Sequence, residues 1–465
     1  MAGEQTRAAA AGGGVSSAEY GRTASFLAIG VGLTGLITYV YFFVASHVLS
    51  TTDYGQIAVV WSAVFITVST LYRPVDQLLS RHISENLAKG EPPREPIRVA
   101  IRIQLGLAVG FAAVALILRG PIEDGLLSGN ETLYWVFLLA VLFYAASYFA
   151  RGYLAGYRRF GLFATMILSE SVFRTSFAVL VAVGLLSGQS AVAIGIVAAP
   201  SLSLLVVPAV FARRARSAPS PPPPEAKRKA SEFSMGSGTG FVAAVLVIML
   251  GEQIFLNAGP LIVRGLEGAA AAGFIFNVLM IARAPLQLFQ AVSTSILPHL
   301  TSLHASAEEG SEAEFRRSVR MVLAAIAAFT AVAAIVFLVA GPQLMQLAFS
   351  DKFSYDRPGL LLVTLGMGLY LSSVTVNQAC LAQGQVRRAA ARWALCAAFF
   401  VAWCFLAPIG DEFRRIEIGF AAAALLLLGL LFAIYRRPHE RPEDVPTAGS
   451  GEELETQLAA ADEGA

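Results

Sequence analysis

RRARSAPSPPPPEAKRKASEF, residues 213–233, divides the chain into two halves of similar length and organisation. The stretch is basic at both ends and contains a run of prolines, which remove backbone donors and break helices. It is too polar to cross a bilayer. We therefore predict a basic, Pro-rich cytoplasmic linker over 213–235. A polyproline II site for another protein is the alternative interpretation of the same prolines.

Six apolar stretches precede this linker and six follow it, and each has about the ~20 residues that a membrane-spanning helix needs. They cover 24–47, 55–79, 99–118, 132–154, 162–186, 191–211, 238–263, 270–298, 319–340, 358–382, 389–408 and 416–435. Hydrophobic residues make up 56% of the chain and charged residues only 14%. We predict an all-α integral membrane protein with about 12 transmembrane helices, in an N-lobe (21–212) and a C-lobe (236–436).

Positive charge is distributed unevenly between the gaps that separate these stretches. The odd-numbered gaps hold six of the 34 Lys and Arg residues, whereas most of the others lie in the tails and the even-numbered gaps. Cationic loops resist translocation, so both termini are predicted to be cytoplasmic. The tails, 1–20 and the acidic 437–465, lack an apolar period and are predicted to be disordered. The first tail also lacks the apolar core of a cleavable signal peptide.

Similar signals recur in the same order in both halves. Asp53-Tyr54-Gly55 opens the second span, and Ala272-Gly273 opens the eighth. Each glycine is followed 26 residues later by a basic residue, Arg81 or His299. Repeats of the same orientation indicate two helical bundles related by a pseudo-two-fold axis along the membrane normal.

Three stretches resemble the polysaccharide-export flippases. They are LSTTDYGQIAVVWS (49–62), RGYLAGYRRFGLFA (151–164) and GFIFNVLMIARAPLQLFQAVSTSILPHLTSL (273–303). These flippases include the O-antigen type (Wzx-like) translocases of the multidrug/oligosaccharidyl-lipid/polysaccharide (MOP) exporter superfamily. The resemblance extends over roughly residues 20 to 436. It implies two six-helix lobes in a MATE-like V shape, with the first, second, seventh and eighth spans around a central cavity.

The resemblance also implies a cargo and a location. The cargo would be a polyprenyl-(di)phosphate-linked oligosaccharide, moved by alternating access from the inner to the outer leaflet for cell-surface polysaccharide biosynthesis. The protein would lie in the bacterial plasma (inner) membrane, among membrane lipids. A polysaccharide polymerase or glycosyltransferases would be its protein partners, and nucleic acid would not be one.

Ionised side chains at bilayer depth cost ~2.5–3.5 kcal/mol each on insertion scales, so they indicate a water-filled cavity or an ion pair. Arg283 lies near the middle of the eighth span, where a guanidinium group would suit a phosphate-bearing cargo. An ion pair with Glu252, at a similar depth in the seventh span, is the alternative. Glu252 would either balance the charge of an arginine or couple transport to a cation or proton.

Arg73 and Asp76 lie in the inner third of the second span, beside Pro74, which is expected to kink the helix. With Arg81 and His82 they would form a basic vestibule for the cargo head group. Snorkelling to the cytoplasmic interface is the alternative.

Other polar groups within the spans have two interpretations. Glu170 and Arg174 are spaced i,i+4, which favours an ion pair within one helix, although Glu170 is also a candidate for coupling to a cation. The uncharged polar residues are concentrated in the second half. They would bind sugar hydroxyl groups or join helices through hydrogen bonds. The candidates for sugar binding are Asn257, Asn277, Gln287 and Gln290.

The chain lacks the motifs of the other functional classes that we considered. It has no GxxxxGK[ST] loop for ATP, no Cys/His cluster for a metal and no arrangement of catalytic side chains, so we predict a transporter without a cofactor rather than an enzyme. The main alternative is an H+- or Na+-coupled drug or metabolite antiporter of the same fold. In that case Glu170, Asp76 or Glu252 would be essential and Arg283 dispensable.

Overall fold

A computed structural model describes residues 17–205, 235–283 and 311–436, and these ranges contain helices but no strands. The N-terminal half contains α2 (Ser17–Val48), α3 (Thr51–Leu71), α4 (Arg73–Ala88), α5 (Arg94–Ile117), the short π-helix η2 (Pro121–Leu126), α6 (Glu131–Gly156), α7 (Phe160–Ala182) and α8 (Gly188–Ser203). The C-terminal half contains α10 (Met235–Glu267), a helix over Ala269–Arg283 (helix 269–283), α12 (Ser311–Phe349), α13 (Arg357–Ala382), α14 (Val386–Leu406) and α15 (Glu412–Tyr435).

The helices confirm the predicted fold class. Within the described ranges, nine helical segments are long and apolar enough to cross a membrane, with α3 and α4 counted as one. Three shorter apolar helices, Gly32–Val48, Gly188–Ser203 and Ala269–Arg283, bring the number to the predicted twelve. The predicted linker and both predicted tails lie almost entirely outside the described residues.

Polar residues fix where several of these helices begin. The side chain of Ser50 accepts a hydrogen bond from the backbone N–H of Asp53 (3.1 Å) at the start of α3. Asn130 caps α6 in the same way, through the N–H of Leu133 (3.1 Å). Such caps satisfy backbone donors that the first helical turn leaves free, so they set helix ends that apolar composition alone does not define.

The second span is broken where the sequence predicts a kink. Helix α3 ends at Leu71 and α4 begins at Arg73, with Tyr72 between them and Pro74 in the first turn of α4. Pro74 has no N–H to donate to the carbonyl of Thr70, so a continuous helix would lose a hydrogen bond there. The break makes Arg73 the first residue of α4.

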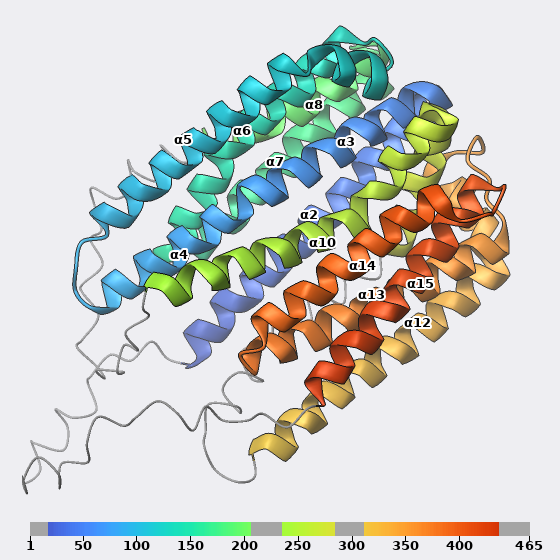
Figure 1. Ribbon diagram of the computed structural model, residues 1–465. Coiled ribbons are helices and arrows are strands. Elements are labelled where there is room, and N and C mark those ends of the chain that lie inside the picture. Colours follow the sequence, from blue (N-terminus) through green and yellow to red (C-terminus); the bar gives the residue numbers. More distant parts are fainter. Residues whose placement is uncertain (1–16, 206–234, 284–310, 437–465) are drawn as a thin grey trace, which may run out of the picture.

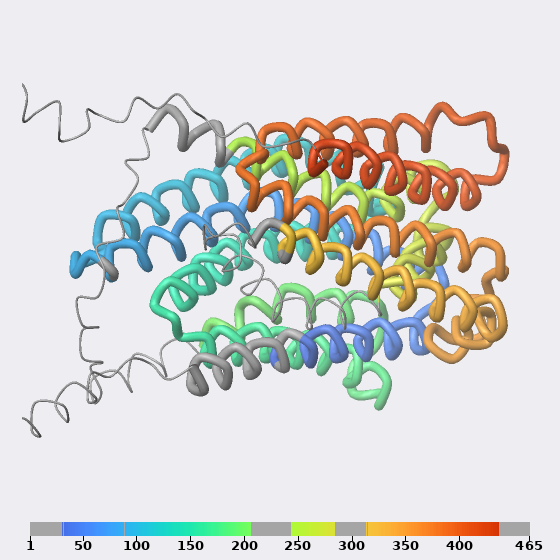
Figure 2. The backbone as a smooth tube through the Cα atoms, turned by 90° about the horizontal axis from the view of Figure 1, so that it is seen from below, coloured from blue at the N-terminus to red at the C-terminus, as the bar shows by residue number. Residues whose placement is uncertain are grey.

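The helices of each half pack mainly on one another (Figure 1). Helix α6 contacts α4, α5 and α8, and α2 contacts α7, whereas α13 and α14 both contact α15. The main contact between the halves joins α3 to α10. Figure 2 shows the same two groups of helices from below, with the N-terminal colours and the C-terminal colours largely separate.

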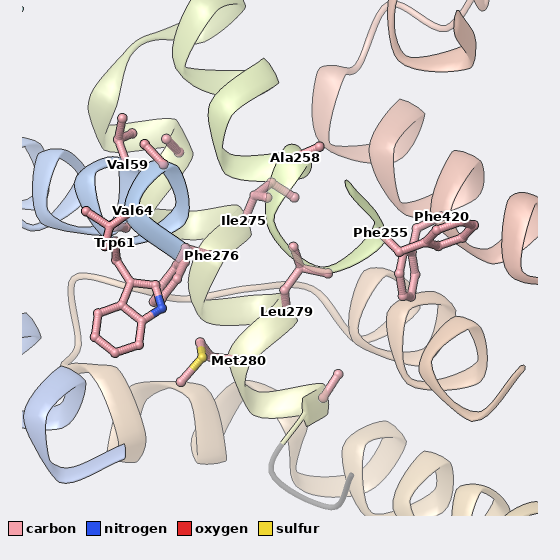
Figure 3. Packing of buried hydrophobic residues seen from close by; sticks show 14 of the residues in the cluster. Val59, Trp61, Val64, Phe255, Ala258, Ile275, Phe276, Leu279, Met280 and Phe420 are labelled. Carbon is pink, nitrogen blue, oxygen red and sulfur yellow. The ribbon is translucent and has the colours of Figure 1, made fainter. Parts of the chain in front are cut away.

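Helix 269–283 adds apolar contacts between these two groups. Figure 3 shows its residues Phe276 and Met280 on the side of Trp61 of α3, and Leu279 nearer to Phe255 of α10. The ring of Phe276 lies 4.6 Å from that of Phe42 in α2, between ring centroids. The core is therefore continuous across the two halves in this region.

The halves are held together at one end of the molecule, which we name the closed end. Lys352 donates to the carbonyl of Leu49 (3.0 Å), and Arg264 donates to the side chain of Ser128 (2.8 Å). Slightly deeper, the hydroxyl of Tyr54 donates to Asn277. The Arg73–Glu252 ion pair also joins the halves, nearer to the opposite end.

Two glycines that occupy matching positions in the sequence repeat touch each other at the closed end. A Cβ atom on Gly273 would lie 3.0 Å from the Cα of Gly55, and a Cβ on Gly55 would lie 1.8 Å from the carbonyl oxygen of Ala269. The second distance leaves no room for a side chain. Equivalent residues of a two-fold repeat can contact each other only beside the symmetry axis, so the predicted pseudo-two-fold axis would pass through this contact.

Replacing Gly55 with Ala is expected to push the halves apart at the closed end, because the new methyl group would overlap the backbone of Ala269. Such overpacking costs ~1–3 kcal/mol. The purified variant should unfold at a lower temperature than the wild type, as measured by thermal denaturation in detergent. Gly265→Ala is the matched control, since a Cβ there meets nothing within 4 Å. Equal melting temperatures for the two variants would contradict the close approach.

Candidate functional site

Two charges from opposite halves meet at the boundary between them. Arg73, at the break between α3 and α4, lies 3.9 Å from the carboxylate of Glu252 in α10, measured from Nη1 to Oε2. The side chain of Arg73 is 42% exposed and that of Glu252 is 18% exposed. The separation allows Coulomb attraction but exceeds the length of a hydrogen bond. The ion pair is therefore loose and accessible.

Arg283 is the last residue of helix 269–283 and shares one electrostatic neighbour, Tyr370, with this pair. Its Nε atom is buried and has no hydrogen-bond partner among the described residues. The hydroxyl groups of Tyr39 and Tyr370 are close enough to interact with it electrostatically, and Tyr370 is also within reach of Glu252 and Arg73. We name Arg73, Glu252, Arg283, Tyr39 and Tyr370 the interlobe cluster. It draws side chains from α2, α4, α10, α13 and helix 269–283.

Tyr39 joins the two halves directly. Its hydroxyl donates a hydrogen bond to the backbone carbonyl of Met280 (2.8 Å), one turn before Arg283. This bond connects α2 of the N-terminal half to helix 269–283 of the C-terminal half. A movement of the halves relative to each other would therefore change the surroundings of Arg283.

A second group of charges continues from the interlobe cluster into the N-terminal half. Asp76 lies one turn after Arg73 and interacts electrostatically with both Arg73 and Arg151 of α6. Arg151 forms an ion pair with Glu170 of α7, which also accepts a hydrogen bond from Ser147. The side chain of Glu170 is only 5% exposed, so Arg151 balances its charge inside the helix bundle.

The structure gives Glu170 a different partner from the expected one. Arg174 donates instead to the hydroxyl groups of Thr38 (3.1 Å) and Ser171 (3.3 Å). Its guanidinium group also lies over the ring of Trp61, 4.5 Å from the centroid. The i,i+4 spacing allows a Glu170–Arg174 pair, but these hydroxyl groups and the aromatic face stabilise Arg174 in another direction.

The uncharged candidates lie at several depths. Asn257 donates to Gln253 on the same helix (3.0 Å), and both are buried. Asn277 is fully buried and accepts the hydrogen bond from Tyr54 at the closed end. The structure therefore does not bring Asn257 and Asn277 into contact with Arg283. Gln287 and Gln290 lie outside the described residues.

The two basic residues expected in the vestibule have partners within their own helix. Arg81 pairs with Glu85 (2.7 Å), and the ring of His82 forms a hydrogen bond with the carbonyl of Leu78 (2.9 Å). Arg81 is exposed, whereas His82 is half-buried.

Sequence reasoning missed Arg151 and Tyr370. Arg151 lies near the end of a predicted span, as a residue at the membrane interface would. A carboxylate inside a span, such as that of Glu170, requires a cation nearby. This requirement could have indicated Arg151 from the sequence. Tyr370 lies within a strongly apolar span and gave no separate signal.

The fold and the interlobe cluster define a class: a multi-pass membrane transporter built from two six-helix halves with charged side chains between them. Solved structures agree. A point mutant of the Vibrio cholerae MATE transporter VcmN is 17% identical, with a TM-score of 0.56, over 89% of this chain and 96% of that chain. An inward-facing MATE family multidrug transporter of the MOP superfamily is 11% identical, with a TM-score of 0.63, over 89% and 97%. The eukaryotic MATE transporter AtDTX14 is 16% identical, with a TM-score of 0.59, over 89% and 94%.

The chain belongs to the polysaccharide biosynthesis protein family, whose model matches residues 20–304. The resemblance to the Wzx-like flippases of the MOP superfamily is thereby confirmed, and family and fold are those of membrane transporters rather than enzymes. No curated protein matched by sequence.

Proposed function

We propose that this protein moves a polyprenyl-(di)phosphate-linked oligosaccharide from the inner to the outer leaflet of the bacterial plasma membrane by alternating access. The observation that carries the proposal is the interlobe cluster. Arg73 of one half and Arg283 of the other approach the same boundary, and Arg283 keeps a buried donor without a partner among the described residues. Two guanidinium groups on either side of a moving boundary suit the phosphate groups of a lipid carrier.

In this proposal the N-lobe (21–212) and the C-lobe (236–436) move relative to each other on the 213–235 linker. With both termini cytoplasmic, the closed end would face the outer side, and the end beyond Arg73 would face the inner side. The contacts of Lys352, Arg264 and Tyr54 at the closed end would break when the cargo is released outward.

The sugar portion of the cargo would meet polar residues at successive depths. Asn257 is near the level of Glu252, whereas Asn277 would become available only after its bond with Tyr54 breaks. Gln287 and Gln290 follow Arg283 by one and two turns in the sequence and complete the proposed sugar-binding set. The polyprenyl chain would remain in the bilayer throughout.

A transport assay with purified full-length protein tests this function. Vesicles would contain the protein and a fluorescent polyprenyl-diphosphate oligosaccharide in one leaflet, and an added glycosidase would report the sugar that reaches the other leaflet. We expect transfer that depends on the protein. The same vesicles loaded with an amphipathic cation test the antiporter alternative. Cation exchange without glycolipid transfer would refute the proposal.

A further inference from the structure

We propose that Glu252 determines specificity by setting the negative charge that a lipid head group must carry in order to occupy the site. This inference rests on the proposed function, because it concerns which lipid enters the same cluster. Glu252 stands opposite Arg73 in the place that an anionic head group would take. It is thus an internal competitor for the cargo, contributed by the other half of the protein.

The geometry of the pair supports competition rather than a permanent structural bond. The two groups are 3.9 Å apart and form no hydrogen bond with each other, and both side chains are partly exposed. Elsewhere in the chain, structural ion pairs are shorter, such as Arg119–Glu123 (2.8 Å) and Arg414–Glu417 (2.8 Å). A loose pair is easier for an incoming anion to displace than a short one. This holds for Arg119–Glu123, which is equally exposed, and for Arg414–Glu417, whose carboxylate is buried.

The charges around the pair determine which anion gains by displacing Glu252. A head group with one negative charge would take the place of Glu252 beside Arg73 and leave the Glu252 carboxylate without a cation, so the exchange gains no additional ion pair. A head group with two or more negative charges would pair with Arg73 and also with Arg283, which has Tyr370 as a neighbour in common with Arg73. Asp76 interacts electrostatically with Arg151 as well as with Arg73, so its negative charge is divided between two cations.

The consequence is discrimination against ordinary membrane lipids. Phosphodiester lipids with a single negative charge greatly outnumber any lipid-linked sugar, and their phosphate would otherwise suit a guanidinium group equally well. Placing a like charge where the wrong ligand would bind is a general means of excluding it. Glu252 would supply this repulsion to monoanionic lipids, whereas a diphosphate overcomes it.

Lipid flipping by the Glu252→Gln variant tests the proposal. Purified full-length protein in vesicles that contain fluorescent phosphatidylglycerol, a monoanion, would be compared with vesicles that contain fluorescent phosphatidylcholine, a zwitterion. Chemical reduction of the outer-leaflet fluorophore gives the flipping rate. We expect Glu252→Gln to flip phosphatidylglycerol about tenfold faster than the wild type, equivalent to ~1.4 kcal/mol. Phosphatidylcholine should stay at the wild-type rate, and Glu252→Asp should resemble the wild type.

Glu123→Gln is the matched control, because it also removes the carboxylate of an ion pair, but at the closed end. Three results would each overturn the proposal: no change in phosphatidylglycerol flipping, equal acceleration by Glu123→Gln, or equal acceleration of phosphatidylcholine. The glycolipid assay on the wild type is read separately. If Glu252→Gln accelerates only phosphatidylglycerol but the wild type does not transfer the glycolipid, the proposed role of Glu252 stands. In that case only the proposed lipid-linked sugar cargo is refuted.

A binding measurement keeps the proposal testable if Glu252→Gln does not fold. Inorganic pyrophosphate should raise the melting temperature of the wild-type protein more than orthophosphate at equal concentration and ionic strength. Replacing Arg73 with Gln should remove that difference. Equal shifts with the two anions in the wild type would contradict a charge threshold.

Discussion

Replacing Arg283 with Ala is expected to abolish surface display of the polymer while leaving the amount of protein in the membrane unchanged. Arg283 would contribute a charge-assisted contact to the cargo phosphate, and the loss of one such partner costs ~2–5 kcal/mol. That loss corresponds to a drop in affinity of ~30-fold or more. Protein level should not fall, because the guanidinium Nε forms no hydrogen bond with the described residues that the fold would lose. Immunoblotting of membranes and staining of surface polymer measure the two quantities.

Two further variants make the result specific. Arg283→Lys keeps the charge but lacks the planar pair of donors, so we expect partial display. Arg102→Ala removes an exposed arginine of α5 and should display polymer normally. Wild-type display by Arg283→Ala would show that Arg283 does not contact the cargo.

Replacing Arg151 with Met is expected to destabilise the protein by ~3–5 kcal/mol, because it leaves the buried carboxylate of Glu170 without its cation. The double variant Arg151→Met/Glu170→Gln should recover most of that loss. It removes both charges, and the glutamine can still accept the hydrogen bond from Ser147. Thermal denaturation of the purified variants measures both effects. Arg98→Met, on the exposed surface of α5, should melt like the wild type.

The same double variant separates a structural role of Glu170 from cation coupling. If Glu170 only balances Arg151, the double variant should still display polymer at a level that follows its stability. A double variant that is as stable as the wild type and yet inactive would instead assign a transport role to Glu170. Equal stability of the single and double variants would contradict a buried ion pair.

The span pattern could be read from the sequence because bilayer thickness imposes a length and a composition on every spanning helix. The break beside Pro74 was equally predictable, since it follows from a missing N–H on a single residue. Tyr54 and Asn277 were different. Each of these residues fits the pattern of its own helix. Nothing in the neighbouring sequence indicates that they form a hydrogen bond with each other across 223 positions.

The same limit applies to the charges in the candidate site. Depth in the membrane can be counted along a helix, so Arg73, Glu252 and Arg283 could be selected as candidates. Their pairing depends on how the helices are rotated and tilted against one another, which tertiary packing decides. For this reason the sequence offers Arg283 as the alternative partner of Glu252, whereas the structure places Glu252 beside Arg73. Glu170 was assigned to Arg174 for the same reason, although Arg151 of the neighbouring helix lies closer.

The contact between Gly55 and Gly273 has a consequence for the ancestry of the chain. If the two repeats arose from one gene, the ancestral unit would have formed a homodimer, and its glycine would have met its own copy in an isologous interface. After fusion of the duplicated genes the two copies could diverge at most positions. Gly55 could not be replaced in this way, because any side chain at that position would overlap the backbone of the other repeat.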